Sequence, residues 1–282
     1  MKLTHMTNKK ILSEYFLVLV GALFYANSYA AAWLQPKGTL LTILNNQAYN
    51  SCSFWNSEGH LQKGPCFFQY SLAPYFEYGV LEKLTLILNP VFDTFNQSAQ
   101  SVPFGFENIF FGGRYSLWKK DWSQFALQIG YNQPIRTSLF GDSPTSVYAI
   151  INRMRYLDAR LLYGTGGALD KYKSSTWYID AEFAYQPSFS GAADEYRFNF
   201  MAGIKTLNER LVFELQEWNA ISGHNAVSPS LPNYDIATVM GDIMYWIIPN
   251  IFSIQFGLQQ DFYGVNIGRG TAPFISLWWR YS

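Results

Sequence analysis

The residues with the chemistry for catalysis are few, and they do not form a known catalytic group. The chain has three histidines, His5, His60 and His224, and histidine is the most frequent proton carrier in catalytic sites. Ala226 stands two residues after His224, where a histidine–serine pair would need its nucleophile. His5 and His60 fall outside the segments that we predict below to be strands. We therefore expect that the protein is not an enzyme and has no catalytic residues.

The two cysteines, Cys52 and Cys66, are the other reactive side chains. With the nearby His60 they offer three ligands at an irregular spacing that matches no zinc motif. An exported chain passes through an oxidising compartment, where such a pair of thiols forms a disulfide. We predict a Cys52–Cys66 disulfide, no metal site and no cofactor.

Charged residues recur at every second position within apolar stretches. Arg197, for example, stands between Tyr196 and Phe198. Alternation with a period of two predicts a strand with one apolar and one polar face. We expect the polar faces to line an interior that carries nine acids and four arginines. These residues are Glu77, Asp93, Arg114, Asp158, Arg160, Asp180, Glu182, Glu195, Arg197, Glu214, Asp242, Asp261 and Arg280.

Two interpretations of this interior remain open. In the first, the charges border a wetted path, and the excess of acids favours cations or polar solutes over anions. In the second, the carboxylates and arginines pair with each other and fill the interior, so they stabilise the fold without a path. A closed sheet of twelve strands encloses more space than the eight-stranded barrels whose interiors side chains can fill.

The alternation predicts twelve strands, each about as long as the ~9–11 residues that a tilted membrane-spanning strand needs. They fall near residues 38–49, 67–79, 83–95, 106–118, 123–136, 153–164, 175–187, 193–205, 210–220, 233–246, 251–263 and 270–281. A glycine-rich stretch, Gly164-Thr165-Gly166-Gly167, reads as a turn after the sixth strand, because it lacks the lysine and hydroxyl residue of a phosphate loop.

Short and long connections alternate along the chain. The short ones are 80–82, 119–122, 206–209 and 247–250, and the long ones are 50–66, 96–105, 137–152 and 221–232. The connections at 164–174 and 188–192 depart from this pattern. This alternation of short and long connections is typical of a barrel with both termini in the periplasm. We predict an all-β fold, an up-and-down antiparallel transmembrane β-barrel of about twelve strands with short periplasmic turns and long outer loops.

The composition supports a surface that faces lipid. Aromatic residues make up 18% of the chain, yet the mean hydropathy is −0.04, as expected for strands that are apolar on one side only. The last residues, Trp278-Trp279-Arg280-Tyr281-Ser282, continue an aromatic strand to the end of the sequence. We predict the outer membrane of a Gram-negative bacterium, with outer-membrane lipid and the barrel-insertion machinery as partners. The net charge is zero and the sequence has no basic run, so we expect no nucleic-acid partner.

The amino terminus has the form of a secretory signal. Lys2, Lys9 and Lys10 precede an apolar run over 15–26, and Ser28-Tyr29-Ala30 offers small residues at a cleavage site. Ala30-Ala31-Ala32 is a second candidate. We predict a cleaved signal peptide at residues 1–30 and an outer-membrane β-barrel at residues 31–282.

Several short elements resemble the XagA-type outer-membrane proteins and, more distantly, the barrels associated with meta-pathway phenol degradation. The elements are Trp33–Gly38, Leu72–Val80, Leu84–Leu86, Phe111–Tyr115 and Ala193–Arg197, and Pro-Tyr-Phe-Glu-Tyr-Gly within the second is the most specific. The similarity covers a pattern of barrel residues without catalytic content. The resemblance implies an outer-membrane barrel linked to exopolysaccharide or surface-polymer systems, or to hydrocarbon uptake.

These features predict a passive channel or export conduit for small polar or saccharide-like solutes, serving in one interpretation an exopolysaccharide system. The alternative is a non-channel structural or surface-interaction barrel that acts through its outer loops.

Overall fold

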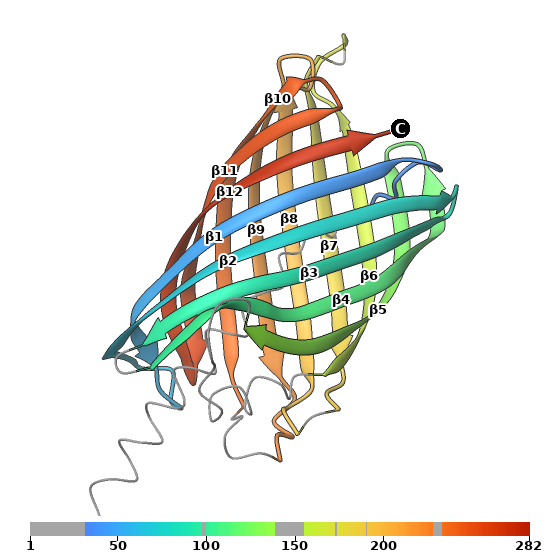
Figure 1. Cartoon of the computed structure of the whole chain (residues 1–282). Coiled ribbons are helices and arrows are strands. Elements are labelled where there is room, and N and C mark those ends of the chain that lie inside the picture. The colour runs from blue at the N-terminus through green and yellow to red at the C-terminus, as the bar shows by residue number, and fades with distance from the viewer. Residues whose placement is uncertain (1–31, 98–99, 139–154, 173, 190, 228–232) are drawn as a thin grey trace, which may run out of the picture.

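The computed structural model describes residues 32–97, 100–138, 155–172, 174–189, 191–227 and 233–282. These residues form twelve strands in one closed sheet (Figure 1). The strands are β1 (Leu40–Trp55), β2 (Leu61–Leu81), β3 (Leu84–Gln97), β4 (Gln100–Lys120), β5 (Ser123–Ser138), β6 (Tyr156–Ala168), β7 (Thr176–Gln186), β8 (Glu195–Thr206), β9 (Leu211–Ser222), β10 (Asp235–Ile248), β11 (Phe252–Val265) and β12 (Ile267–Tyr281). None of the described segments is a helix long and apolar enough to span a membrane.

Each strand pairs antiparallel with the next along the chain, and β12 returns to pair with β1. The closing ladder aligns Leu40 with Tyr281 and Leu44 with Leu277. Closure removes the two free edges that an open sheet would present, so the backbone donors and acceptors of every strand have a partner strand on both sides. The predicted twelve-stranded up-and-down barrel is confirmed.

The two faces of each strand differ as the alternation predicts. On β8, the side chains of Tyr196, Phe198 and Phe200 are 41–47% exposed, whereas those of Glu195 and Arg197 are buried. Exposed rings also pair between strands on the outside, with ring centroids of Phe183 and Phe198 5.1 Å apart. The apolar face therefore points outward, as in barrels whose outer face contacts hydrocarbon, and the charged face points into the barrel.

Four of the five connections at the end where β1 begins and β12 ends are tight turns, and the β6–β7 connection is longer. Asp121, Asn208 and Asn250 take positive φ angles of 49°, 56° and 59° in three of them, a conformation that Asp and Asn tolerate better than most residues. The predicted short turns near 80–82, 119–122, 206–209 and 247–250 are confirmed.

The predicted long loops at 50–66 and 96–105 are wrong in extent. β1 continues to Trp55 and β2 begins at Leu61, while only residues 98–99 separate β3 from β4. The β1–β2 ladder continues to the pair Trp55–Leu61. The residues at this end of the hairpin are more polar, so the apolar–polar alternation that marks a strand in the sequence fades there. The predicted loop at 137–152 lies almost wholly outside the described residues. The loop at 221–232 agrees with the end of β9, although 228–232 also lie outside them.

The glycine-rich stretch predicted as a turn, residues 164–167, belongs to β6 instead. Gly164 points inward, and a Cβ atom there would lie 2.5 Å from Oδ1 of Asp180 and 3.1 Å from Cβ of Ala32. The glycine is therefore explained by the close approach of another segment of the chain rather than by a change of chain direction.

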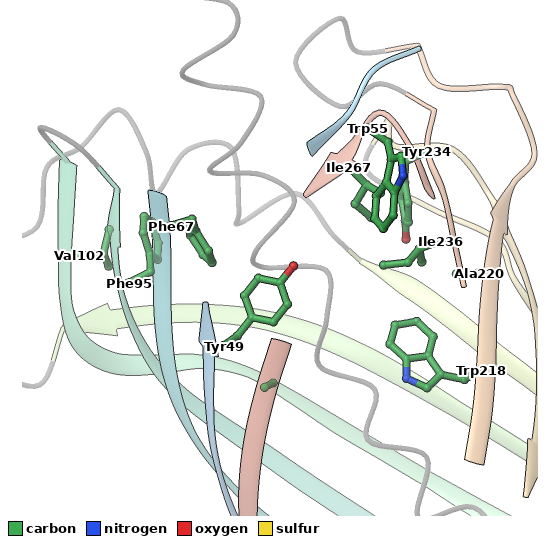
Figure 2. Close-up of a cluster of buried hydrophobic side chains, with 11 residues drawn as sticks. Tyr49, Trp55, Phe67, Phe95, Val102, Trp218, Ala220, Tyr234, Ile236 and Ile267 are labelled. Atoms are coloured by element: carbon green, nitrogen blue, oxygen red, sulfur yellow. The ribbon is translucent and has the colours of Figure 1, made fainter. Parts of the chain in front are cut away.

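Buried apolar side chains gather on the inner wall near the end of the barrel opposite the tight turns (Figure 2). The rings of Phe67 and Phe95 lie 5.9 Å apart, and Tyr49 meets Phe67 edge-on at 6.1 Å. Trp55 and Tyr234 lie together on the other side of the view. The interior is thus apolar as well as polar at this level, which the two-face pattern did not predict.

The predicted disulfide is present. Cys52 is bonded to Cys66, and their Cα atoms are 4.0 Å apart. The bond joins β1 to β2 where the register shifts, between the pairs Ser51–Phe67 and Ser53–Lys63. Because β2 has extra residues at this point, the crosslink fixes an irregular part of an otherwise regular hairpin.

We expect Cys52→Ser to loosen this hairpin without altering the melting temperature of the barrel. Closing a loop of about 15 residues removes roughly 3 kcal/mol of unfolded-state entropy, but strand pairing below the bond already holds the hairpin together. The expected result is faster tryptic cleavage after the exposed Lys63, with heat-modifiable gel migration unchanged. Ser53→Ala in the same hairpin is the control, and free thiols in protein purified without reductant would contradict the prediction.

Candidate functional site

A cavity of about 380 Å³ lies inside the barrel at the end with the tight turns. Trp122 and Glu209, from the β4–β5 and β8–β9 turns, form part of its wall, so the cavity reaches this end of the molecule. Its charged lining residues are Glu77, Arg114, Asp180, Lys205, Glu209, Glu214 and Arg280. Its larger apolar and aromatic lining residues are Trp33, Trp177, Tyr178, Met201, Met240, Met244, Trp246, Phe274 and Trp278.

The segment that precedes β1 forms one side of the cavity. The backbone N–H of Ala32 donates to Oδ1 of Asp180 on β7 (3.1 Å), and that of Gln35 donates to Oγ1 of Thr85 on β3 (3.0 Å). The Gln35 side chain donates to Oε2 of Glu77 (2.7 Å). Contacts to strands on different parts of the wall place residues 32–36 inside the barrel.

Gly79 and Gly164 make room for this segment. A Cβ atom at Gly79 would overlap the carbonyl of Pro36, and one at Gly164 would press on Ala32 and Asp180. Any larger residue at either position would push the segment away from the wall. The internal position of residues 32–36 is therefore supported by the strands as well as by its own hydrogen bonds.

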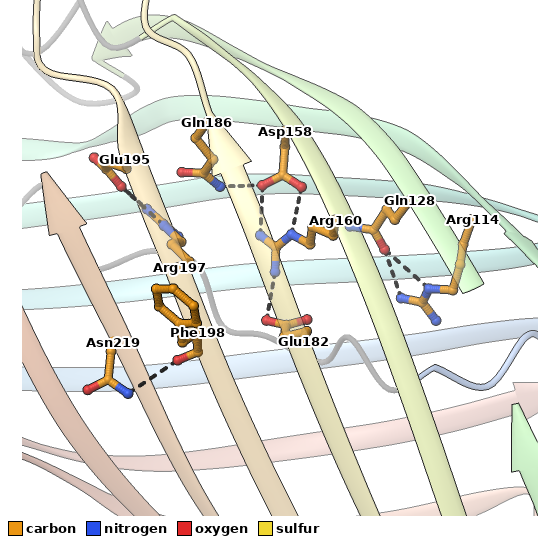
Figure 3. A network of polar contacts seen from close by, with 10 residues as sticks. All are labelled: Arg114, Gln128, Asp158, Arg160, Glu182, Gln186, Glu195, Arg197, Phe198 and Asn219. Atoms are coloured by element: carbon orange, nitrogen blue, oxygen red, sulfur yellow. Dashed lines mark hydrogen bonds and ion pairs between the residues drawn. The ribbon is translucent and has the colours of Figure 1, made fainter. Parts of the chain in front are cut away.

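A buried ion pair anchors the same region. Nη1 of Arg114 lies 3.0 Å from Oε1 of Glu77, and both side chains are almost fully buried. Tyr75 donates its hydroxyl to the same carboxylate (2.6 Å), and Nη1 of Arg114 also donates to the Trp33 carbonyl (3.0 Å). Its remaining nitrogens donate to Oε1 of Gln128 at 3.1 and 3.2 Å (Figure 3). The guanidinium thus connects β2, β4, β5 and the internal segment.

Two further ion-pair groups follow the inner wall of β6, β7 and β8 (Figure 3). Arg160 binds both Asp158 (2.6 Å) and Glu182 (3.0 Å), and the Gln186 amide donates to Asp158. Arg197 binds Glu195 at 2.8 Å. Each group neutralises its carboxylates locally, because an unpaired buried charge would cost several kcal/mol.

All thirteen residues that we predicted to line the interior lie on the inward face of their strands. Glu77, Arg114, Asp180, Glu214 and Arg280 border the cavity. Others are held in contacts of their own, such as Asp93 with Gln69 (2.8 Å) and Asp261 with Tyr49 (2.9 Å). That any of the thirteen lines a path for water stays a prediction.

Several lining residues were missed by sequence reasoning. Trp33 and Gln35 precede the first strand, and no periodic pattern marks them. Lys205 could have been found, because it continues the inward series of β8 that begins with Glu195 and Arg197. Glu107, which does not line the cavity, was missed as a buried acid. It lies where β4 shifts register against β3, and a shift of this kind cannot be read from alternation.

The described residues contain no group of three or more His, Cys, Asp and Glu that could hold a metal ion. The predictions that the protein has no metal, no cofactor and no catalytic activity remain predictions.

No family model matches the sequence, and no curated protein matches it. The fold does match solved structures. An outer membrane channel from Pseudomonas putida F1 aligns with a TM-score of 0.61 at 9% identity, covering 88% of this chain and 97% of that chain. The NanC porin aligns with a TM-score of 0.45 at 6% identity (84% and 98% covered), and the CymD monoaromatic hydrocarbon channel with 0.42 at 12% (88% and 89%). The first match shows that this chain has the fold of an outer-membrane β-barrel, and the other two scores are too low to support an argument.

We expect Arg114→Leu to lower the free energy of unfolding by about 3–5 kcal/mol, because it leaves Glu77 as a buried charge without its cation. Combining it with Glu77→Gln should recover most of the loss. Urea unfolding of the refolded protein in detergent, followed by tryptophan fluorescence, measures both. Arg155→Leu, at an exposed arginine, is the control. An unchanged urea midpoint for Arg114→Leu would contradict the prediction.

Proposed function

We propose that the protein is a passive channel of the Gram-negative outer membrane for small polar or saccharide-like solutes. The observation that carries this proposal is a cavity of about 380 Å³ with carboxylates, amides and arginine in its wall, inside a closed barrel of twelve strands. A barrel of this size has more internal space than side chains alone fill. The apolar outer face supports the lipid as its surroundings.

The orientation follows from the connections. Short turns face the periplasm in barrels of this kind, so the cavity would open toward the periplasm. We further propose that residues 1–30 are removed as a signal peptide; they lie outside the described residues. The barrel-insertion machinery would then be a partner during assembly. The XagA-type resemblance supports an exopolysaccharide or surface-polymer system as the setting in which the solute is handled.

Residues 32–36 would form the constriction of such a channel. They contact β2, β3, β4 and β7 from inside and form one side of the cavity. Solutes that enter from the periplasmic side must pass this segment. The extent to which it narrows the path sets the conductance.

Planar-bilayer recording of the refolded mature chain tests the proposal. We expect discrete conductance steps, and a variant that lacks residues 31–35 should conduct about two- to threefold more, because the wider twelve-stranded lumen is then less filled. Removing the mostly exposed residues 224–227 from the β9–β10 connection is the control, with no such increase expected. A protein that gives no conductance above background, with or without residues 31–35, would exclude a channel.

The acids of the inner wall should contribute unequally to the preference for cations over anions. Asp180 and Glu214 border the cavity without an ion pair to any arginine or lysine in the part of the chain that the structure describes, whereas Glu182 and Glu195 are bound to Arg160 and Arg197. We expect Asp180→Asn with Glu214→Gln to roughly halve the potassium-to-chloride permeability ratio, because the local negative potential attracts cations. Glu182→Gln or Glu195→Gln should change it much less. Reversal potentials in a salt gradient measure this, and equal shifts for both sets would contradict it.

A second candidate function is a non-conducting barrel that acts through its outer connections. The observation that favours it is an ordered junction between the β7–β8 and β9–β10 connections. The Asp194 N–H donates to Asn225 Oδ1 (2.9 Å), and Asn225 Nδ2 donates back to Asp194 Oδ2 (3.1 Å). Partial burial by itself raises the pKa of Asp194, but hydrogen bonds from Ser188, Tyr185 and Asn225 outweigh it and lower the pKa below its usual value. The bilayer experiment decides between the two candidates.

A further inference from the structure

A row of inward-facing residues crosses six neighbouring strands beside the cavity. The register pairs each residue directly with the next, and the row runs Tyr178, Gly203, Glu214, Asp242, Gly257 and Phe274 from β7 to β12. Two carboxylates stand at its centre, a glycine follows on either side, and an aromatic residue ends each half. Tyr178, Glu214 and Phe274 border the cavity.

When both are ionised, the two carboxylates form an unfavourable pair. Like charges directly opposite each other on neighbouring strands destabilise a sheet, and burial strengthens the repulsion. Glu214 accepts hydrogen bonds from the Tyr178 hydroxyl and from Nε2 of Gln255 (3.2 Å). Asp242 is only 7% exposed, and its carboxylate oxygens have no hydrogen bond of normal geometry among the described residues, with Gln255 and Glu214 as their polar neighbours. Along β10 it stands between Met240 and Met244, which line the cavity, whereas Asp242 itself is not among the lining residues.

The glycines allow the aromatic rings to lie against the wall on both sides of this pair. A Cβ atom at Gly203 would overlap the Tyr178 ring, and one at Gly257 would overlap the Phe274 ring. The rings therefore approach the carboxylates along the wall instead of standing away from it. Aromatic faces attract cations, more strongly where water is excluded.

Two of the basic side chains that line the cavity, Arg114 and Arg280, are engaged away from the row. Arg114 binds Glu77 at 3.0 Å, and the Arg280 guanidinium lies 5.6 Å from the centre of the Trp246 ring. Nζ of Lys205 lies 5.3 Å from the centre of the Tyr178 ring. No described basic side chain forms an ion pair with Glu214 or Asp242. The Lys205 contact shows that a cation already fits against one end of the row.

We propose that Glu214 and Asp242 bind an organic ammonium ion whose apolar part lies against Tyr178, Phe274 and the cavity methionines. The ammonium group would donate hydrogen bonds to the carboxylate oxygens and relieve their repulsion. A divalent metal fits less well, because Ca²⁺ takes six to eight oxygen ligands and Mg²⁺ an octahedral set, and the described residues offer no group of three such acidic or histidine ligands. The apolar lining suits the carbon skeleton of an amine and contributes nothing to a bare ion.

This site goes beyond the proposed passage of solutes, because binding needs only access from the turn end and no open path through the barrel. A barrel without conductance could still bind the amine, and a conducting barrel could fail to bind it. The two proposals therefore stand or fall on separate measurements.

The test is titration of the refolded mature chain in detergent with 2-phenylethylammonium chloride. Tryptophan fluorescence and calorimetry report binding, since Trp177, Trp246 and Trp278 line the cavity. Neutral 2-phenylethanol has nearly the same size and should bind at least about tenfold more weakly, because it lacks the charge that the carboxylates and rings recognise.

Variants then locate the site. Glu214→Gln with Asp242→Asn should weaken binding of the ammonium ion by at least about tenfold. Phe274→Leu should weaken it several-fold, because leucine keeps an apolar side chain but lacks the aromatic ring. Lys205→Gln should strengthen binding, because it removes a competing positive charge. Glu217→Gln changes an acid on the same strand that points outward, and it should leave affinity unchanged. Heat-modifiable migration confirms that each variant is folded, and Phe274→Leu serves if the double variant does not fold.

Three results would overturn the proposal. Equal affinity for the alcohol and the ammonium ion would show that the carboxylates take no part. Undiminished ammonium binding in the folded double variant, or in Phe274→Leu, would place the amine elsewhere. Displacement of the ammonium ion by micromolar CaCl₂ would assign the pair to a metal ion instead.

Discussion

Closure of the sheet is the constraint on which the rest of this structure depends. Hydrocarbon offers no hydrogen bonds, so a strand edge exposed to lipid would leave a row of backbone groups unsatisfied at several kcal/mol each. The β1–β12 ladder removes that edge. Once the sheet is closed, every strand has one face toward lipid and one toward the interior, and residues two apart must share a face. The apolar belt and the charged interior both follow from this.

The interior must then accommodate charges that the outer face excludes. The structure does this in three ways. Arginines neutralise Glu77, Asp158, Glu182 and Glu195. Neutral donors satisfy Asp261, which accepts from Thr238 and Tyr49 and from the Gly270 N–H. The Glu214–Asp242 pair has no arginine partner among the described residues and only a few neutral donors, and it stands beside the cavity. A buried pair of like charges is stable only when a cation or a shared proton joins it, which is why this place in the wall is distinct.

The internal segment and the cavity depend on each other. Residues 32–36 lie inside because Gly79 and Gly164 leave space and because Asp180, Thr85, Glu77 and Arg114 supply hydrogen-bond partners. Without the segment, the same wall would expose a wider and more polar lumen. In the proposed channel, the segment would select solutes by size and the charged wall would select them by charge.

The amino-acid sequence by itself determined the number of strands, their two faces, most of the tight turns and the disulfide. These features are local, since period-two alternation, turn residues and a pair of cysteines act over a few positions. The ends of β1, β2 and β4 could not be predicted, because backbone pairing continues where the side-chain alternation fades. The site was decided by register: Glu214 and Asp242 are 28 positions apart and meet only because β9 and β10 pair as they do. The Ala32–Asp180 contact joins residues separated by 148 positions. Which acids obtain a partner is a property of the closed barrel, because only closure sets the distances between side chains that share its interior.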